Sequence, residues 1–128
     1  GVAAEPIADY VLSVLLEQSL ALNARRVKNA ADWERESTLV ISQPMGLLAQ
    51  QTLGIVGYGA IGKAVAQRAK AFGMTVQVLR NGKGSAQLTE DGASHAKDLS
   101  QLLASSDHVV LALPLTMPFP KVAKVQQT

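Results

Sequence analysis

A glycine-rich hexapeptide at residues 57–62 carries the clearest chemical signal in this sequence. It reads Gly57-Tyr58-Gly59-Ala60-Ile61-Gly62, with a short apolar run before it and a helical spacing of apolar residues after it. In that context the first glycine permits a tight turn, the second lets the backbone approach a pyrophosphate, and the third lets a helix lie close to a strand. The N–H groups that begin the helix would supply hydrogen bonds and partial positive charge to phosphates. The segment predicts a dinucleotide site, and a purely structural glycine turn is the alternative.

The residue at the end of the next expected strand bears on which nicotinamide dinucleotide is bound. NAD-binding domains usually carry Asp or Glu there, which accepts hydrogen bonds from the ribose hydroxyls. In this chain the position is Arg80, followed by Asn81 and then Lys83. A carboxylate would repel a 2′-phosphate, whereas a guanidinium can bind one through charge-assisted hydrogen bonds. The sequence therefore favours NADP as the cofactor, and an exposed Arg80 beside an NAD site is the alternative.

No catalytic or metal-binding group of residues is predicted. Neither His95 nor His108 has a carboxylate at a spacing that suggests an acid–base pair or metal ligation, so a structural or surface role is expected for each. The sequence contains no cysteine, which excludes a disulfide scaffold, a thiolate metal site and a cysteine nucleophile.

The elements that must position the hexapeptide alternate between strands and helices. A helix is expected from Ala60 to Phe72, with Gly73 as a left-handed cap, and a polar loop from Asn81 to Gly92. A second, short helix should begin at Asp98, whose side chain is a typical N-cap. Four runs are typical of strands: Thr52–Val56, Thr75–Leu79, Ser94–Ala96 and His108–Leu113. This alternation predicts an α/β fold, a partial Rossmann domain with a doubly wound parallel sheet.

A long helix over residues 5–26 is expected to precede that domain. Pro6 suits its first turn, and its apolar residues cover more than the single stripe of a helix that lies on one core. One face should pack on its own domain and the other on a second chain or domain, and a fully buried central helix is the alternative. Residues 27–50 are interpreted as a helix tail and a connection.

Composition narrows the classes of function. The 128 residues are 48% hydrophobic and 17% charged, which fits one globular domain. The apolar runs are too short to span a bilayer, and no signal peptide is expected at the start of the sequence. No Asp or Glu lies between Glu36 and Glu90, whereas five basic residues do, which favours an anionic ligand over the alternative of solvated surface charges. Aromatic residues make up only 4%, which argues against nucleic acid as a partner.

A series of motifs together resembles the NAD(P)-binding domain of the D-isomer-specific 2-hydroxyacid dehydrogenases, which include glyoxylate/hydroxypyruvate reductases. The motifs lie within residues 2–116: Ala8-Asp9-Tyr10-Val11-Leu12, Trp33, the run 51–62, Lys70-Ala71-Phe72-Gly73-Met74, Asp98-Leu99, Ser106-Asp107 and Leu113-Pro114-Leu115-Thr116. The resemblance implies a homodimer through the helix 5–26. It also implies that the adenine lies near Leu113 and Pro114, with Thr116 close to the same wall.

The resemblance further implies an oxidoreductase that transfers a hydride between the nicotinamide and a small 2-hydroxy or 2-oxo acid. Arg80 favours glyoxylate or hydroxypyruvate as the acid that is reduced. The family's substrate-binding Arg, its Glu and its acid–base His lie after the Pro-Leu-Thr motif and are not among these residues, so this chain alone is expected to be inactive. A non-catalytic NAD(P)-binding sensor or corepressor-like module is the alternative function.

Three segments are expected: residues 1–50 as the N-terminal helix and connection, 51–116 as the dinucleotide-binding core, and 117–128 as an atypical tail that matches nothing in the family. Residue 1 is Gly rather than Met, so the chain is expected to be part of a longer protein, which is expected to be cytoplasmic, with organelle targeting as the alternative. The tail is expected to be a truncated or alternative end, and a diverged tail is the alternative. An Arg or Lys often found in the family at the position of Ala60 is missing here. The site is therefore expected to depend more on backbone N–H groups.

Overall fold

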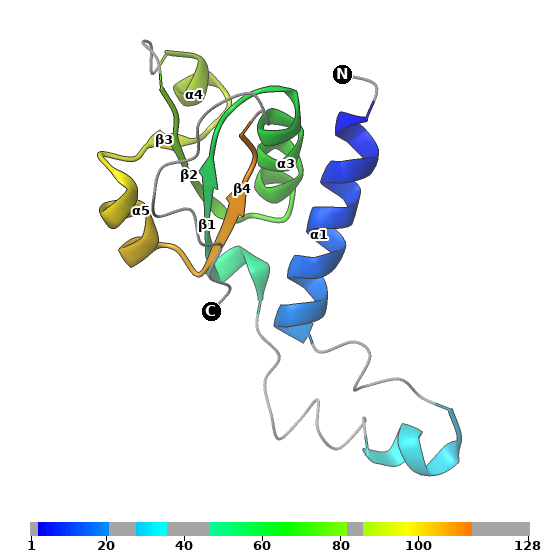
Figure 1. Ribbon diagram of the computed structural model, residues 1–128. Helices are drawn as coiled ribbons and strands as arrows, with labels where there is room; N and C mark the ends of the chain where they lie inside the picture. Colours follow the sequence, from blue (N-terminus) through cyan, green and yellow to red (C-terminus); the bar gives the residue numbers. More distant parts are fainter. Residues whose placement is uncertain (1–2, 21–27, 36–46, 82–85, 114–128) are drawn as a thin grey trace.

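A four-stranded parallel sheet with the order β3-β2-β1-β4 forms the centre of the computed structural model (Figure 1). The structure describes residues 3–20, 28–35, 47–81 and 86–113. The strands are β1 (Thr52–Val56), β2 (Thr75–Leu79), β3 (Ser94–His95) and β4 (His108–Leu111). This arrangement confirms the predicted α/β class and the partial doubly wound parallel sheet.

Helices cover both faces of the sheet. The helices are α1 (Ala4–Leu20), the 3-10 turn η1 (Leu48–Gln50), α3 (Ala60–Ala71), α4 (Ala86–Glu90) and α5 (Leu99–Ser105), and residues 30–35 form a further short helix. In Figure 1, α1 and α3 lie side by side on one face, and α5 lies on the other. Because strand β1 is sandwiched between these layers, its residues are almost wholly buried, which explains its continuous apolar run.

The strand order reverses beside β1, and this reversal determines where a ligand can bind. The chain leaves β1 through α3 to β2 on one side, and later returns through α5 to β4 on the other side. Connections that leave a parallel sheet in opposite directions open a crevice at the carboxyl ends of the two central strands. The glycine-rich hexapeptide begins directly at that end of β1.

Helix α5 is held to the sheet by a buried polar contact and a close approach. Gln77, in the middle of β2, is 6% exposed, and its amide nitrogen donates to the hydroxyls of Ser105 at 2.6 Å and Ser106 at 2.8 Å. A Cβ on Gly54 would lie 2.6 Å from the Leu102 side chain, so only a glycine in β1 lets α5 pack this closely. These contacts fix the crossover that brings β4 to the site.

Helix α1 has one buried face and one exposed face in this chain, so it is not the fully buried central helix of the alternative interpretation. Its buried residues are Ala4, Ala8, Leu12 and Leu15, whereas Ile7 and Tyr10 are exposed. The Arg68 side chain of α3 pairs with Glu5 and with Asp9, at 2.7 Å for Asp9, and so links α3 to the first turns of α1.

Several predicted boundaries need correction. The helix expected to reach Phe72 ends at Ala71, and the strand expected over 94–96 ends at His95. The helix expected over 5–26 starts at Ala4 and is described to Leu20, and residues 21–27 lie outside the described residues. The strand expected to reach Leu113 ends at Leu111. The loop expected over residues 81–92 contains α4, whose Leu88 is completely buried in the core. Among the described residues, no helix combines the length and the apolar character needed to cross a membrane.

Candidate functional site

The carboxyl ends of β1, β2 and β4 are joined by backbone hydrogen bonds around Gly57. The Gly57 N–H donates to the Leu79 carbonyl at 2.7 Å, and the Ala112 N–H donates to the Val56 carbonyl at 2.8 Å. Gly57 has a φ of 97°, a left-handed conformation that strongly favours glycine. The turn therefore leaves the sheet from a rigid base.

The three glycines of the hexapeptide differ in what surrounds them. A Cβ on Gly57 would lie 2.6 Å from the Ala112 carbonyl oxygen, and a Cβ on Gly62 would lie 2.5 Å from the Gly57 carbonyl oxygen. A Cβ on Gly59, in contrast, would meet no atom of the described residues within 4 Å. Packing within the described chain thus requires a glycine at positions 57 and 62, while Gly59 leaves an open space.

That open space lies at the N-terminus of α3. Gly59 is the N-cap residue, and the helix has no side-chain cap. The N–H groups in the first turn of a helix have no carbonyl partner within the helix and carry partial positive charge. Beside them is a mainly apolar hollow of about 240 Å³, lined by Ala3, Ala4, Gly59, Ala60, Ile61, Ala112 and Leu113. The site can therefore accept a phosphate through backbone donors, next to apolar surface.

Tyr58, Arg80 and Asp91 meet beyond the end of β2. The Arg80 guanidinium carbon lies 5.8 Å from the centre of the Tyr58 ring, a cation–π distance. The Tyr58 hydroxyl donates to the Asp91 carboxylate. Partial burial, together with this hydrogen bond and the negative charge of Asp91, raises the pKa of Tyr58 above its usual value, and Arg80 opposes the rise only in part. Tyr58 therefore stays neutral and acts as a donor at physiological pH.

The remaining predicted site residues fall into two groups. Asn81 is exposed directly after Arg80, and the Leu113 side chain would lie 3.1 Å from a Cβ on Gly57. Lys83, Pro114 and Thr116 lie outside the described residues. The structure thus brings Arg80, Asn81 and Leu113 to the same end of the sheet as the hexapeptide.

Asp91 belongs to this site, although the sequence predicts only that it lies in a polar loop. It directly follows Glu90, the first acidic residue after the interval without carboxylates, and it reaches Tyr58 because α4 and the following turn return the chain to the edge of β2. No spacing in the sequence signals this contact, since it depends on the placement of a five-residue helix.

The histidines lie away from the glycine turn. His108 begins β4, at the opposite end of the parallel sheet, and is 5% exposed. Its Nε2 lies 2.7 Å from the Gln51 side-chain oxygen, and burial lowers its pKa, opposed by the charge of Asp107. His95 is exposed on β3. Within the described ranges, no three His, Asp or Glu side chains gather as a metal site would need.

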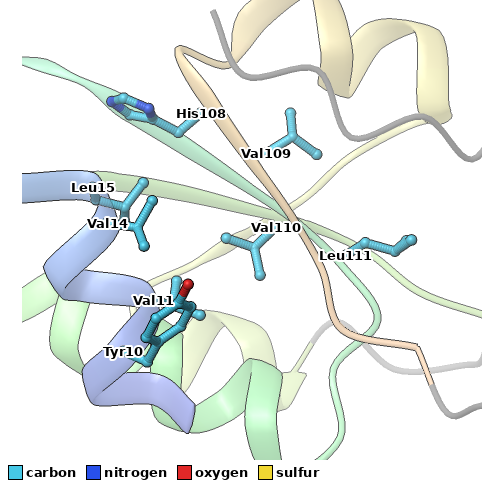
Figure 2. A pocket seen from close by; sticks show the side chains of 8 residues that line it. All are labelled: Tyr10, Val11, Val14, Leu15, His108, Val109, Val110 and Leu111. Carbon is cyan, nitrogen blue, oxygen red and sulfur yellow. The ribbon is translucent and has the colours of Figure 1, made fainter. Parts of the chain in front are cut away.

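A second hollow, also of about 240 Å³, lies between α1 and β4 (Figure 2). Aliphatic side chains of Val11, Val14 and Leu15 from α1 face Val110 of β4, with Tyr10 at the edge of the group, whereas the Leu111 side chain points away from α1. His108 is the only one of its lining residues that can carry a positive charge, and none is an Asp or Glu. Unlike the glycine turn, the described residues that line this hollow offer no helix N-terminus whose N–H groups could bind a phosphate.

Comparison with known proteins agrees with this geometry. Residues 18–119 match the family model described as the NAD-binding domain of D-isomer-specific 2-hydroxyacid dehydrogenases. A glyoxylate reductase of Thermococcus gammatolerans is 37% identical over 115 residues, which cover 85% of this chain and 33% of that protein. A glyoxylate/hydroxypyruvate reductase B of Pectobacterium carotovorum is 40% identical over 120 residues, 90% of this chain and 36% of that protein.

Solved structures show the same fold. The PH0520 protein of Pyrococcus horikoshii superposes with a TM-score of 0.75 at 29% identity, over 91% of this chain and 35% of that chain. A D-lactate dehydrogenase of Aquifex aeolicus, solved with NAD and lactic acid, gives a TM-score of 0.66 at 30% identity, over 88% of this chain and 32% of that chain. This chain spans about a third of the length of these relatives.

Proposed function

The chain belongs to the D-isomer-specific 2-hydroxyacid dehydrogenases through their NAD-binding domain, and we propose that it binds NADP in preference to NAD as the cofactor-binding part of such an oxidoreductase. The observation that carries this proposal is the open space at Gly59 above the N-terminus of α3. A position that packing leaves free, in a loop whose other two glycines are tightly packed, is what close approach of a pyrophosphate requires.

Each part of the dinucleotide has a place in the proposal. The backbone of residues 57–62 would hold the pyrophosphate, and Arg80, Asn81 and Lys83 would surround the adenosine ribose. Leu113, Pro114 and Thr116 would form the wall for the adenine. These residues belong to the segment 51–116, which we assign as the cofactor-binding core, with residues 1–50 as a preceding helix and connection.

The preference for NADP is supported by the charge and placement of Arg80. It follows β2 directly, at the position where NAD-binding domains usually present a carboxylate to the ribose. Its guanidinium can form two charge-assisted hydrogen bonds with a 2′-phosphate. Asp91 adds a carboxylate nearby, but the Tyr58 hydroxyl already donates to it.

The proposed reaction is the reduction of a small 2-oxo acid such as glyoxylate or hydroxypyruvate. The names of the relatives in Thermococcus and Pectobacterium support this substrate class. The bound cofactor supplies the hydride, and this chain's own contribution is to bind and orient it. Groups that bind the acid and transfer the proton would come from outside the described residues.

A dimer through α1 is part of the proposal. Ile7 and Tyr10 are exposed on the face of α1 that does not pack on α3, and exposed apolar side chains grouped on one helix face suit a second copy of the same helix. Sedimentation equilibrium of the chain and of an Ile7→Glu variant would test it. A wild-type monomer at micromolar concentration would contradict this part.

The function is tested by titrating the chain with NADPH and with NADH by calorimetry. The proposal expects both to bind at one site, with the lower Kd for NADPH, and expects Arg80→Ala to reduce that preference at least about tenfold. Tighter binding of NADH by the wild-type chain would contradict the NADP assignment. The longest natural protein that contains this sequence should also be assayed with glyoxylate. If that protein binds NADPH but does not reduce glyoxylate, the result would favour the non-catalytic module.

A further inference from the structure

We propose that Tyr58 is a positioning residue that holds the Arg80 guanidinium for the 2′-phosphate of NADP. The inference rests on the proposed function and deepens it, because it assigns cofactor selectivity to a side chain of the glycine turn as well as to Arg80. It also gives Asp91 a role, as the group that fixes the Tyr58 ring.

The sheet places Tyr58 and Arg80 next to each other. In the register of β1 and β2, Val56 pairs with Leu79, and the Gly57 N–H continues the ladder to the Leu79 carbonyl. Arg80 is the first residue after β2. Tyr58 is the first residue after β1 that has a side chain, because Gly57 precedes it. The 5.8 Å between the guanidinium carbon and the ring centre puts the cation over the aromatic face.

The Tyr58 ring is held at its far end as well. Its hydroxyl donates to Asp91, which lies in the turn between α4 and β3. That turn is fixed by the fully buried Leu88 and by the hydrogen bond at 2.8 Å from the Ala93 N–H to the Leu88 carbonyl. The ring thus spans the end of β2 between two rigid points, the Gly57 turn and the α4–β3 turn.

A guanidinium held in this way has a functional advantage. Arg80 is half-buried at the site, and its long side chain would otherwise lose rotamer freedom when it binds a phosphate. The cation–π contact with Tyr58 already restricts the guanidinium in the free protein. Preorganisation of this kind lowers the entropic cost of binding, and the gain applies only to the ligand that Arg80 contacts.

Selectivity is therefore the property that separates this role from a merely structural one. If Tyr58 only packs against the loop, its loss should weaken the binding of NADPH and of NADH equally. If Tyr58 positions Arg80, its loss should weaken the binding of NADPH alone. Because the aromatic face carries the contact, Tyr58→Phe should retain most of the selectivity that Tyr58→Leu loses.

The experiment measures Kd for NADPH and NADH by calorimetry in the wild-type chain, Tyr58→Leu, Tyr58→Phe and Tyr58→Met. Phe72→Leu is the matched control, since Phe72 is an exposed aromatic residue at the opposite end of α3 from the glycine turn. The ratio of Kd for NADH to Kd for NADPH should fall about two- to fivefold in Tyr58→Leu and in Tyr58→Met, and stay at the wild-type value in Phe72→Leu. It should fall less in Tyr58→Phe, which keeps the ring and loses only the hydrogen bond to Asp91. In an Arg80→Ala background, Tyr58→Leu should leave the ratio unchanged.

The outcomes distinguish this inference from the proposed function. A wild-type chain that prefers NADPH, with an unchanged ratio in both Tyr58→Leu and Tyr58→Met, would overturn the role of Tyr58 and leave the cofactor assignment intact. Equal loss in Tyr58→Phe and Tyr58→Leu would overturn the role of the ring. A wild-type chain that prefers NADH would overturn both.

Discussion

The carbonyl oxygen of Gly57 lies 2.5 Å from the point where a Cβ on Gly62 would stand. The first residue of the hexapeptide thus excludes a side chain from the last, and helix α3 rests directly on the turn that leaves β1. This contact sets the height of the α3 N-terminus above the sheet, and with it the open space at Gly59.

Gly62→Ala should lower the free energy of unfolding by at least about 1 kcal/mol. The added methyl group would press on the backbone at Gly57, where overpacking of a rigid site costs roughly 1–3 kcal/mol, more than the gain in helix propensity returns. Urea denaturation measures the change. Gly59→Ser, in the same loop but in open space, is the control and should change the free energy of unfolding by only a few tenths of a kcal/mol, because Ser and Gly are both favourable at an N-cap. Equal stability of Gly62→Ala and wild type would show that the close packing is absent.

Gln77→Met should destabilise the chain by about 1–3 kcal/mol, because it removes the amide that donates to Ser105 and Ser106 while keeping a similar volume. The exposed Gln67 of α3 offers the same chemical change as a control, and Gln67→Met should be nearly neutral. Thermal unfolding of both variants tests the claim that this contact holds α5 on the sheet. Two equal melting temperatures would contradict it.

The pH dependence of stability should report His108. Burial lowers the pKa of His108 below its usual 6.5, so the unfolded chain takes up the proton first as the pH falls. Stability should therefore decline below about pH 6.5, and the decline should be shallower in His108→Gln than in wild type. His95→Gln, at an exposed position on β3, serves as the control. Identical pH profiles of wild type and His108→Gln would contradict a neutral, buried His108.

The sequence was sufficient to predict the glycine turn and the strands around it. The hexapeptide is contiguous, and β1 and β2 are buried on both faces, so their apolar runs match their bounds at Thr52–Val56 and Thr75–Leu79. Arg80 could be found because it directly follows β2, a fixed step along the chain from the turn. Local pattern therefore determined most of the proposed cofactor site.

Contacts between distant segments could not be predicted in the same way. Helix α4 has only five residues, and its packing depends on Leu88, whose burial no periodicity reveals. Asp91 reaches Tyr58 only because that helix is present. The sequence places Gly54 in a strand, but no local pattern shows that Leu102 of α5 packs against this position.

The central claim, that the N-terminus of α3 accepts the phosphates of a dinucleotide, is tested most directly at Gly59. Gly59→Asp introduces a favourable N-cap and a negative charge in the open space, and Gly59→Asn introduces the same shape without the charge. Both variants should melt at or above the wild-type temperature, and Gly59→Asp should weaken NADPH binding at least about tenfold, more than Gly59→Asn does. Wild-type affinity in a folded Gly59→Asp variant would contradict the account.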